Sequence, residues 1–474
     1  MIFNSFIFIW LFPIIFIIYY TFNYVFKNVW NNIGNITLLI ISYLLYINWK
    51  PAYAILLLGI TAITYISAII VEKTKYKRKY IISTGVLLTI LPLLIFKYYN
   101  FINTSITEIL DIIGISFHIP GLNWSIPIGI SFFTFQALGY LWDVYYGRIK
   151  AERNWLDYML FVSFFPQIAS GPISKACNLL PQIKSRRTFD YKNAIEGLKL
   201  LLWGMFLKVV LADRLGLYVD SVYNNYIYQS GLSCLIASIT YSFQIYGDFA
   251  GYSLMAIGTG RLFGFKLINN FNRPYLSTSV TDFWRRWHIS LSLWLKDYIY
   301  IPLGGSRCNK LKNYRNILVT FLISGIWHGA NWNFIIWGIL HGFFQIIEKI
   351  FNLQKNNTTG IIKAFRIIIT FILINTAWIF FRLPSIDDAC NVIGKIFTNL
   401  SSDLFLPSNS NLAFMLMSLT IVIIKELIEE FFPNKITLFD NKFTIVRWIT
   451  YFSIVVIILL CGVFDSGQFI YINF

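Results

Sequence analysis

Long apolar runs without a charged side chain recur along this chain, and they constrain its fold more than any other feature. Residues 1–26 contain no charge, and the first cation is Lys27. Six further charge-free runs lie at 51–71, 80–96, 124–142, 224–247, 317–347 and 404–424. Each is near or above the roughly 20 residues that a helix needs to cross the hydrocarbon core of a bilayer. The sequence therefore predicts an all-α polytopic membrane protein.

Composition and charge support this interpretation. Charged residues make up 13% of the chain, against roughly 25% in a soluble domain, so a fully solvated surface is excluded. The formal net charge is +17, but Lys and Arg form short clusters between apolar runs. This pattern is typical of positive-inside topology and argues against nucleic acid as a partner. The five cysteines form no C-x-x-C pair, so we expect neither a disulfide framework nor a metal site.

Weaker apolar segments raise the expected number of spanning helices to about 11. They lie at 33–49, 193–211, 367–381 and 448–464. The strongest basic cluster, residues 72–79, marks a cytoplasmic loop, because short basic loops stay in the cytosol. Counting back from this loop places the N-terminus outside. Residues 1–26 have no basic region before them and are expected to remain as a helix, not to be cleaved as a signal peptide.

Two apolar segments, 155–174 and 274–303, have basic residues close on both sides. Because the positive-inside rule keeps both flanks of each segment in the cytosol, we expect each segment to enter the membrane and return. Pro and Gly interrupt the segment 155–174, and irregular backbone is tolerated at membrane depth only when it is surrounded by protein. No soluble domain, long linker or internal repeat is visible, so residues 1–474 are expected to form a single membrane-embedded domain.

Polar groups collect in residues 274–347, which hold three of the four histidines. His328 lies near the middle of the longest charge-free run, between Gly325 and Gly329. At about 1.5 Å per residue the run is long for one span, so we expect a tilted helix or two half-helices broken near Gly329. His328 is either a packed histidine bonded to a carbonyl or a functional one. The glycines and Asn331 favour opened backbone that lines a cavity.

Residues 281–298 have the spacing of an amphipathic helix. One face carries Trp284, Trp287, Leu291 and Trp294. His288 and Ser292 lie one turn apart on the neighbouring face. On spacing alone this is an interfacial helix with Trp and Arg at headgroup depth. A polar site inside the membrane is the alternative.

Asp248 is the only charged residue between Asn224 and Gly260. A lone carboxylate within the membrane is a functional candidate, because its burial is costly unless it is used or paired. A partner such as Arg285 or Arg286 would instead make it structural, and we favour this second interpretation.

Four motifs in a fixed order extend the analysis. They are FNRPY at 271–275, DFWRRWHIS at 282–290, DYIYIPLGG at 297–305 and GIWHG at 325–329. Together with PIGISFFTFQ at 127–136 and FPQIASGPI at 165–173, they make the chain resemble the membrane-bound O-acyltransferase (MBOAT) family. Within that family it is similar to the bacterial alginate O-acetyltransferase branch, over nearly its whole length. Leu254 departs from the pattern, since relatives are expected to carry an acidic residue there.

This resemblance implies a tunnel across the protein, so the expected fold is MBOAT-like, with about 11 transmembrane helices and re-entrant segments around a central tunnel. His328 matches the essential histidine of the family, and His288 matches its second polar active-site position. The other residues expected at the site are Gly325, Gly329, Asn331 and Asp248 as tunnel lining, and Arg285, Arg286 and Arg307 as donor-binding residues. The three arginines would hold the phosphates of a thioester donor, acetyl-CoA or an acyl carrier. Positive-inside anchoring explains the same arginines equally well. No bound cofactor is expected.

The function implied is transfer of an acetyl group from a cytosolic thioester to hydroxyls of an exported or cell-envelope polysaccharide, such as an alginate-like exopolysaccharide or peptidoglycan. The enzyme would lie among the lipids of the bacterial inner membrane. It would reach the acceptor directly or through an extracytoplasmic acetyltransferase partner. D-alanyl transfer to teichoic acid is the alternative within the family. A polytopic transporter is the alternative from another class, although it predicts inverted repeats that are not visible.

Overall fold

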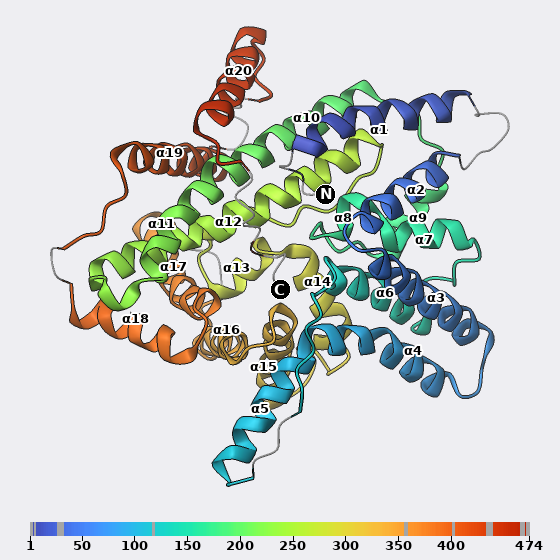
Figure 1. The fold of residues 1–474 in the computed structure, drawn as a ribbon, viewed down its shortest axis with the longest axis horizontal. Coiled ribbons are helices and arrows are strands. Elements are labelled where there is room, and N and C mark those ends of the chain that lie inside the picture. The colour runs from blue at the N-terminus through green and yellow to red at the C-terminus, as the bar shows by residue number, and fades with distance from the viewer. Residues whose placement is uncertain are drawn as a thin grey trace. The chain divides into compact units, whose positions relative to one another are not determined.

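The computed structural model describes residues 3, 6–25, 33–115, 119–354, 359–400, 403–432, 439–464 and 470. In this part of the chain the regular structure is helical throughout and contains no β-strand (Figure 1). The all-α class predicted from the sequence is confirmed. The chain divides into two compact units, one formed by residues 1–197, 256–268 and 471–474 and the other by 198–255 and 269–470.

The first unit contains the N-terminal helices. They are α1 (Phe6–Val25), α2 (Ile33–Ile47), α3 (Pro51–Lys73), α4 (Arg78–Leu93), η1 (Leu94–Tyr98), α5 (Tyr99–Ile112), α6 (Ile130–Tyr145), α7 (Trp155–Ser163), α8 (Phe165–Ile168) and α9 (Ala176–Lys184). Two helices contribute residues to both units. They are α10 (Tyr191–Met205) and α12 (Gly231–Leu262).

The second unit contains the candidate site. Its elements are η2 (Phe206–Ala212), α11 (Asp213–Tyr223), η3 (Tyr226–Tyr228), η4 (Pro274–Leu276), α13 (Val280–Arg286), α14 (Ile289–Leu295), η5 (Lys296–Tyr300), α15 (Lys310–His328), α16 (Trp332–Ile350), α17 (Gly360–Arg382), α18 (Ile386–Thr398), α19 (Asn409–Phe431) and α20 (Thr444–Cys461). Three of the short helices, η1, η2 and η5, are π-helical.

Among the described residues, six helices are long and apolar enough to cross a membrane. They are Ile7–Val25, Pro51–Lys73, Arg78–Ile112, Gly360–Arg382, Asn409–Phe431 and Thr444–Cys461. The protein is therefore a multi-pass membrane protein. The sequence analysis expected about 11 spans, partly because it counted runs 124–142 and 224–247. These runs belong to α6 and α12, whose side chains are mostly buried, so their apolar composition also serves packing.

The charge-free run 317–347 forms a helical hairpin, not one span. Within this run, helix α15 ends at His328 and helix α16 starts at Trp332. The two helices pack along each other (Figure 1). Of the two alternatives that we expected, one tilted helix is wrong and a break near Gly329 is observed. Close approach depends on glycine: a Cβ on Gly325 would collide with the carbonyl oxygen of Phe334, and one on Gly338 with that of Phe321.

The segment 155–174 is built from short helices and returns to where it began. Helix α7 has nine residues, about 14 Å at the usual rise, which is less than half of a hydrocarbon core. The Nζ of Lys184, after the segment, lies 2.6 Å from Oε2 of Glu152, before it. Arg153 in turn pairs with Glu72 in the basic loop. The two flanks therefore meet within the first unit.

This geometry predicts the topology of the segment. On a background without the five native cysteines, single cysteines at the exposed positions Lys150 and Arg186 should react alike, and neither should react with an impermeant reagent applied from outside. A cysteine at Gly121, expected on the outer side, should react with that reagent and serves as the control. Labelling of positions 150 and 186 from opposite faces would show that the segment spans the membrane.

The close packing of α15 against α16 leads to a prediction about thermal stability. Gly338→Val should lower the thermal stability of the purified protein in detergent, because the new side chain must push α15 away from α16, at a cost of about 1–3 kcal/mol. The matched control is Gly394→Ala in α18, where a Cβ would meet nothing within 4 Å. It should keep or raise stability, since Ala favours a helix over Gly. Equal melting temperatures for the two variants would contradict the packing described here.

Candidate functional site

Two histidines are buried side by side in the second unit. His288 is 0% exposed and His328 is 2% exposed, and their ring centroids are 6.5 Å apart. His288 lies between α13 and α14, and His328 is the last residue of α15. They are 40 positions apart in the sequence, and tertiary packing brings them together.

The helix predicted over 281–298 is interrupted at His288. Helix α13 ends at Arg286, and His288 adopts the left-handed conformation (φ 42°, ψ 53°) before α14 begins at Ile289. This conformation is uncommon for a residue that carries a Cβ. The interruption gives the His288 side chain a different direction from the one it would have in a continuous helix.

The apolar face predicted for this segment is buried in protein and is not exposed at the surface, as an interfacial helix would be. Trp284, Trp287, Leu291 and Trp294 are each at most 7% exposed. Trp287 packs on Trp378 with ring centroids 5.1 Å apart. Phe283 stacks on Trp287 with ring centroids 5.4 Å apart. The interfacial-helix interpretation is therefore wrong for these tryptophans.

Aromatic rings surround both imidazoles. Phe249 lies 4.6 Å from His288 between ring centroids, and Trp337 and Phe381 lie 4.9 and 5.3 Å from His328. Trp327 contacts both histidines, at 5.8 and 5.0 Å. Burial lowers the pKa of His288 to about 3, because a low-dielectric environment disfavours the imidazolium. His288 is therefore uncharged at neutral pH.

The residues expected to line a tunnel have other contacts. A Cβ on Gly325 or Gly329 would collide with Phe334, so neither glycine faces open space. Asn331 caps α16 by accepting from the amide of Asn333 at 2.9 Å. Its Nδ2 donates to the carbonyl of Pro384. All three positions thus have a structural explanation in the hairpin.

Asp248 is an ion-pair partner of Lys208. The lysine Nζ lies 2.6 Å from Oδ1 of Asp248 and 2.6 Å from Oδ1 of Asp213, and all three side chains are at most 2% exposed. The amide of Ile470 donates to Oδ2 of Asp248 at 2.8 Å. The structural interpretation of Asp248 is supported, but the partner is Lys208 and not Arg285 or Arg286.

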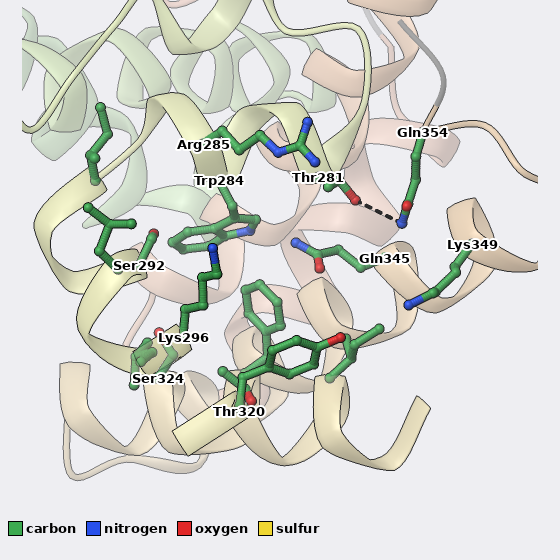
Figure 2. Close-up of a pocket in the computed structure, with 16 residues that line it drawn as sticks. Thr281, Trp284, Arg285, Ser292, Lys296, Thr320, Ser324, Gln345, Lys349 and Gln354 are labelled. Atoms are coloured by element: carbon green, nitrogen blue, oxygen red, sulfur yellow. Dashed lines mark hydrogen bonds between the residues drawn. The ribbon is translucent and has the colours of Figure 1, made fainter. Parts of the chain in front are cut away.

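A pocket of about 400 Å³ is lined by Ile289, the neighbour of His288 in the chain, and by Ser324, one turn before His328, but not by the histidines themselves (Figure 2). Its lining comes from α13, α14, η5, α15 and α16. The polar members are Thr281, Arg285, Ser292, Lys296, Tyr300, Thr320, Ser324, Gln345, Lys349 and Gln354. Figure 2 shows Trp284, Lys296 and Gln345 projecting toward the same space from three different helices. Ser324 and Ser292 each lie one helical turn from one of the histidines.

The three arginines predicted to bind a donor separate in the structure. Arg285 is exposed and lines the pocket. Arg286 is neutralised by Asp282 and Glu430, with N···O distances of 3.2 and 3.0 Å, so its role is structural. Arg307 is exposed but does not line the pocket.

Sequence analysis missed two cations of this pocket, Lys296 and Lys349. Neither Arg285 nor Lys296 forms an ion pair within the described part of the chain. Lys349 donates to Oδ1 of Asn313. The available signal was the presence of a polar side chain in each of two largely apolar segments, Lys296 after residues 289–295 and Gln345 in the charge-free run 317–347. Their convergence depends on how the hairpin packs against α13 and α14.

The remaining histidine of residues 274–347, His341, is a packing residue. It is fully buried, and its Nδ1 accepts a hydrogen bond of 3.3 Å from the Trp284 indole. The fourth histidine, His118, lies outside the described residues. Within the described ranges, no group of three or more His, Cys, Asp or Glu side chains is arranged to hold a metal ion.

Comparison with known proteins identifies the family. The model of the membrane-bound O-acyltransferase family matches residues 148–386. The chain is 35% identical to "Probable alginate O-acetylase AlgI" of Pseudomonas aeruginosa, covering 84% of this chain and 75% of that protein. It is 38% identical to a peptidoglycan O-acetyltransferase of Helicobacter pylori, covering 75% and 72%.

A more distant relative is a teichoic acid D-alanyltransferase of Bacillus subtilis, at 26% identity over 71% of this chain and 86% of that protein. The resemblance carried by the six sequence motifs is confirmed, and the family is one of acyltransferases. The chain belongs to the membrane-bound O-acyltransferase family and is an O-acyltransferase.

Proposed function

We propose that this enzyme moves an acetyl group from a thioester donor to hydroxyl groups of an exported or cell-envelope polysaccharide. The observation that carries the proposal is the pair of buried histidines, 6.5 Å apart. The residues Ile289 and Ser324, close to them in the chain, line a pocket with three cations. The similarity to proteins named as alginate and peptidoglycan O-acetyltransferases supports acetyl as the group and a polysaccharide as the acceptor.

His328 acts as the general base in this proposal. Its imidazole takes the proton of the acceptor hydroxyl, and the oxygen attacks the thioester carbonyl as the proton leaves. The C–S bond then breaks, and the departing sulfur takes a proton, so that an ester and a free thiol result. Direct attack within a positioned complex needs no covalent enzyme intermediate. Aromatic surroundings exclude water, which would otherwise compete with the acceptor.

His288 is the second polar group at the reacting centre. Because it is uncharged at neutral pH, it can donate a hydrogen bond from one ring nitrogen and accept at the other. It is placed to orient the hydroxyl or to polarise the thioester carbonyl, while His328 takes the proton. The buried hydroxyl of Ser324, one turn from His328, faces the pocket side of the same centre.

The cationic pocket is the proposed donor site. Arg285, Lys296 and Lys349 line it with hydroxyl and amide groups, and this chemistry fits the phosphates of acetyl-CoA or of a carrier's phosphopantetheine. Arg307, which does not line the pocket, is left to the positive-inside explanation. The pocket volume of about 400 Å³ is within the range of small-molecule sites.

The acceptor side and the setting of the enzyme are also proposals. The polysaccharide is modified directly or through an extracytoplasmic acetyltransferase partner, and the chain lies in the bacterial inner membrane. The tunnel implied by family resemblance would join the donor pocket to the outer side. Residues 1–474 would act as one membrane-embedded domain, which the family match across 148–386 supports because it draws on both compact units.

D-alanyl transfer to teichoic acid is the second candidate, favoured by the similarity to the Bacillus subtilis enzyme. Donor choice separates the two. Purified enzyme in proteoliposomes should consume acetyl thioester in the presence of an acceptor polysaccharide and should leave a D-alanyl carrier protein unused. If the enzyme used the D-alanyl carrier and not the acetyl thioester, D-alanyl transfer to teichoic acid would be the supported function.

His328→Ala should abolish acetyl transfer, with a loss of at least about 10²-fold in kcat, because general base catalysis contributes this much or more. The measurement is release of free thiol together with ester formation on the acceptor. His341→Ala is the matched control, since it removes another fully buried imidazole of the same hairpin. It should lower stability but keep kcat in the folded fraction. Near-normal transfer by well-folded His328→Ala would overturn the catalytic role.

His288→Ala should also lower kcat strongly, but a residual rate should remain because His328 is still present. A steady-state analysis that separates kcat from the donor KM tests this. Full activity of His288→Ala would restrict the reacting centre to His328.

The donor pocket makes its own prediction. Arg285→Gln and Lys296→Gln should each raise the KM for acetyl-CoA about tenfold while kcat changes little, because each removes a charge-assisted contact to phosphate. Lys310→Gln, an exposed cation of α15 outside the pocket, is the control and should leave the KM unchanged. An unchanged KM in the two pocket variants would place the donor elsewhere.

A further inference from the structure

His288 occupies a helix-capping position that its side chain does not serve. It is the N-cap residue of α14, and its side chain forms no capping hydrogen bond. N-cap positions favour Ser, Thr, Asp and Asn because their side chains accept from the first amides of a helix, which have no partner within the helix. A buried helix start therefore needs a cap from elsewhere in the chain.

Asn270 supplies that cap from the segment between α12 and η4. Its carbonyl oxygen accepts from the amide of Ile289 at 3.0 Å. Its side-chain Oδ1 accepts from the amide of Ser290 at 3.1 Å. One buried residue, 1% exposed, thus satisfies the first two amides of α14, immediately after His288.

The backbone just before His288 is hydrogen-bonded by the same segment, between α12 and η4. The amide of Asn272 donates to the carbonyl of Arg286 at 2.9 Å, and the Arg286 guanidinium is fixed by Asp282 and Glu430. The backbone is therefore held on both sides of His288 by residues 270–272. A left-handed residue with a Cβ persists only where its surroundings impose that conformation.

We infer that Asn270 is a positioning residue for His288. By capping α14 in place of His288, it holds the His288 backbone in the left-handed conformation, in which the imidazole lies 6.5 Å from that of His328 between ring centroids. This inference rests on the proposed function for the importance of His288, but the geometric part does not depend on which acyl group is transferred.

The test compares Asn270→Ala with Asn270→Asp. Alanine removes the Oδ1 acceptor and should lower kcat at least about tenfold with the donor KM within about twofold, since misorientation of a reacting group affects the transition state more than donor binding. Aspartate keeps an acceptor at a helix start, where Asp caps as well as Asn, and should restore most of kcat. Asn375→Ala is the control, because Asn375 is a buried asparagine of the same unit that bonds to Ser238 and Ser242 instead.

A double-variant cycle separates positioning from general structural support. If Asn270 acts through His288, Asn270→Ala should have no further effect on kcat in a His288→Ala background. An equal loss in both backgrounds would overturn the inference, and so would an equal loss in Asn375→Ala or a normal kcat in folded Asn270→Ala.

Hydrogen exchange distinguishes failure of this inference from failure of the proposed function. Absence of acetyl transfer by the wild-type protein, or full activity of His288→Ala, would count against the proposed function. Independently of activity, Asn270→Ala should speed amide exchange over residues 289–292 at least about tenfold, whereas Asn270→Asp and Asn375→Ala should not. Unchanged exchange in Asn270→Ala would overturn the positioning role.

Discussion

Exclusion of water from the interior is the constraint on which the rest of this structure depends. A buried charge without a partner is costly, so buried charges of the second unit are paired. Lys208 lies between two carboxylates, and Arg286 lies between Asp282 and Glu430. The bond from Lys208 to Asp248 joins η2 to α12, and the bond from Arg286 to Glu430 joins α13 to α19.

The same constraint shapes the chemistry. His288 and His328 lie among aromatic rings, where no bulk water can compete as an acceptor and where an imidazole is more stable uncharged. Cations are kept at the pocket, beside this dry centre and not inside it. A donor with phosphates and an acyl thioester would match this division, with its charged part at the cations and its reactive end near the histidines.

Particular residues show how far sequence reasoning reached. The all-α membrane class, the possible break near Gly329 and the family followed from apolar runs and motifs, which are local features. The continuous helix over 281–298 was wrong, because apolar spacing is the same on both sides of His288 and does not reveal a left-handed residue. Gly325 and Gly329 looked like space for a ligand, but their space is taken by Phe334, which only packing can show.

The sequence by itself determined that this protein is a helical membrane enzyme of the O-acyltransferase family, because hydropathy and motif order depend only on which residues follow one another. Tertiary structure alone decided that His288 lies beside His328, that Asp248 pairs with Lys208 and that Asn270 caps α14. Each of these contacts joins residues between 19 and 40 positions apart. Such pairs form because the buried groups of separate helices must satisfy one another, and no local pattern records which partner each group finds.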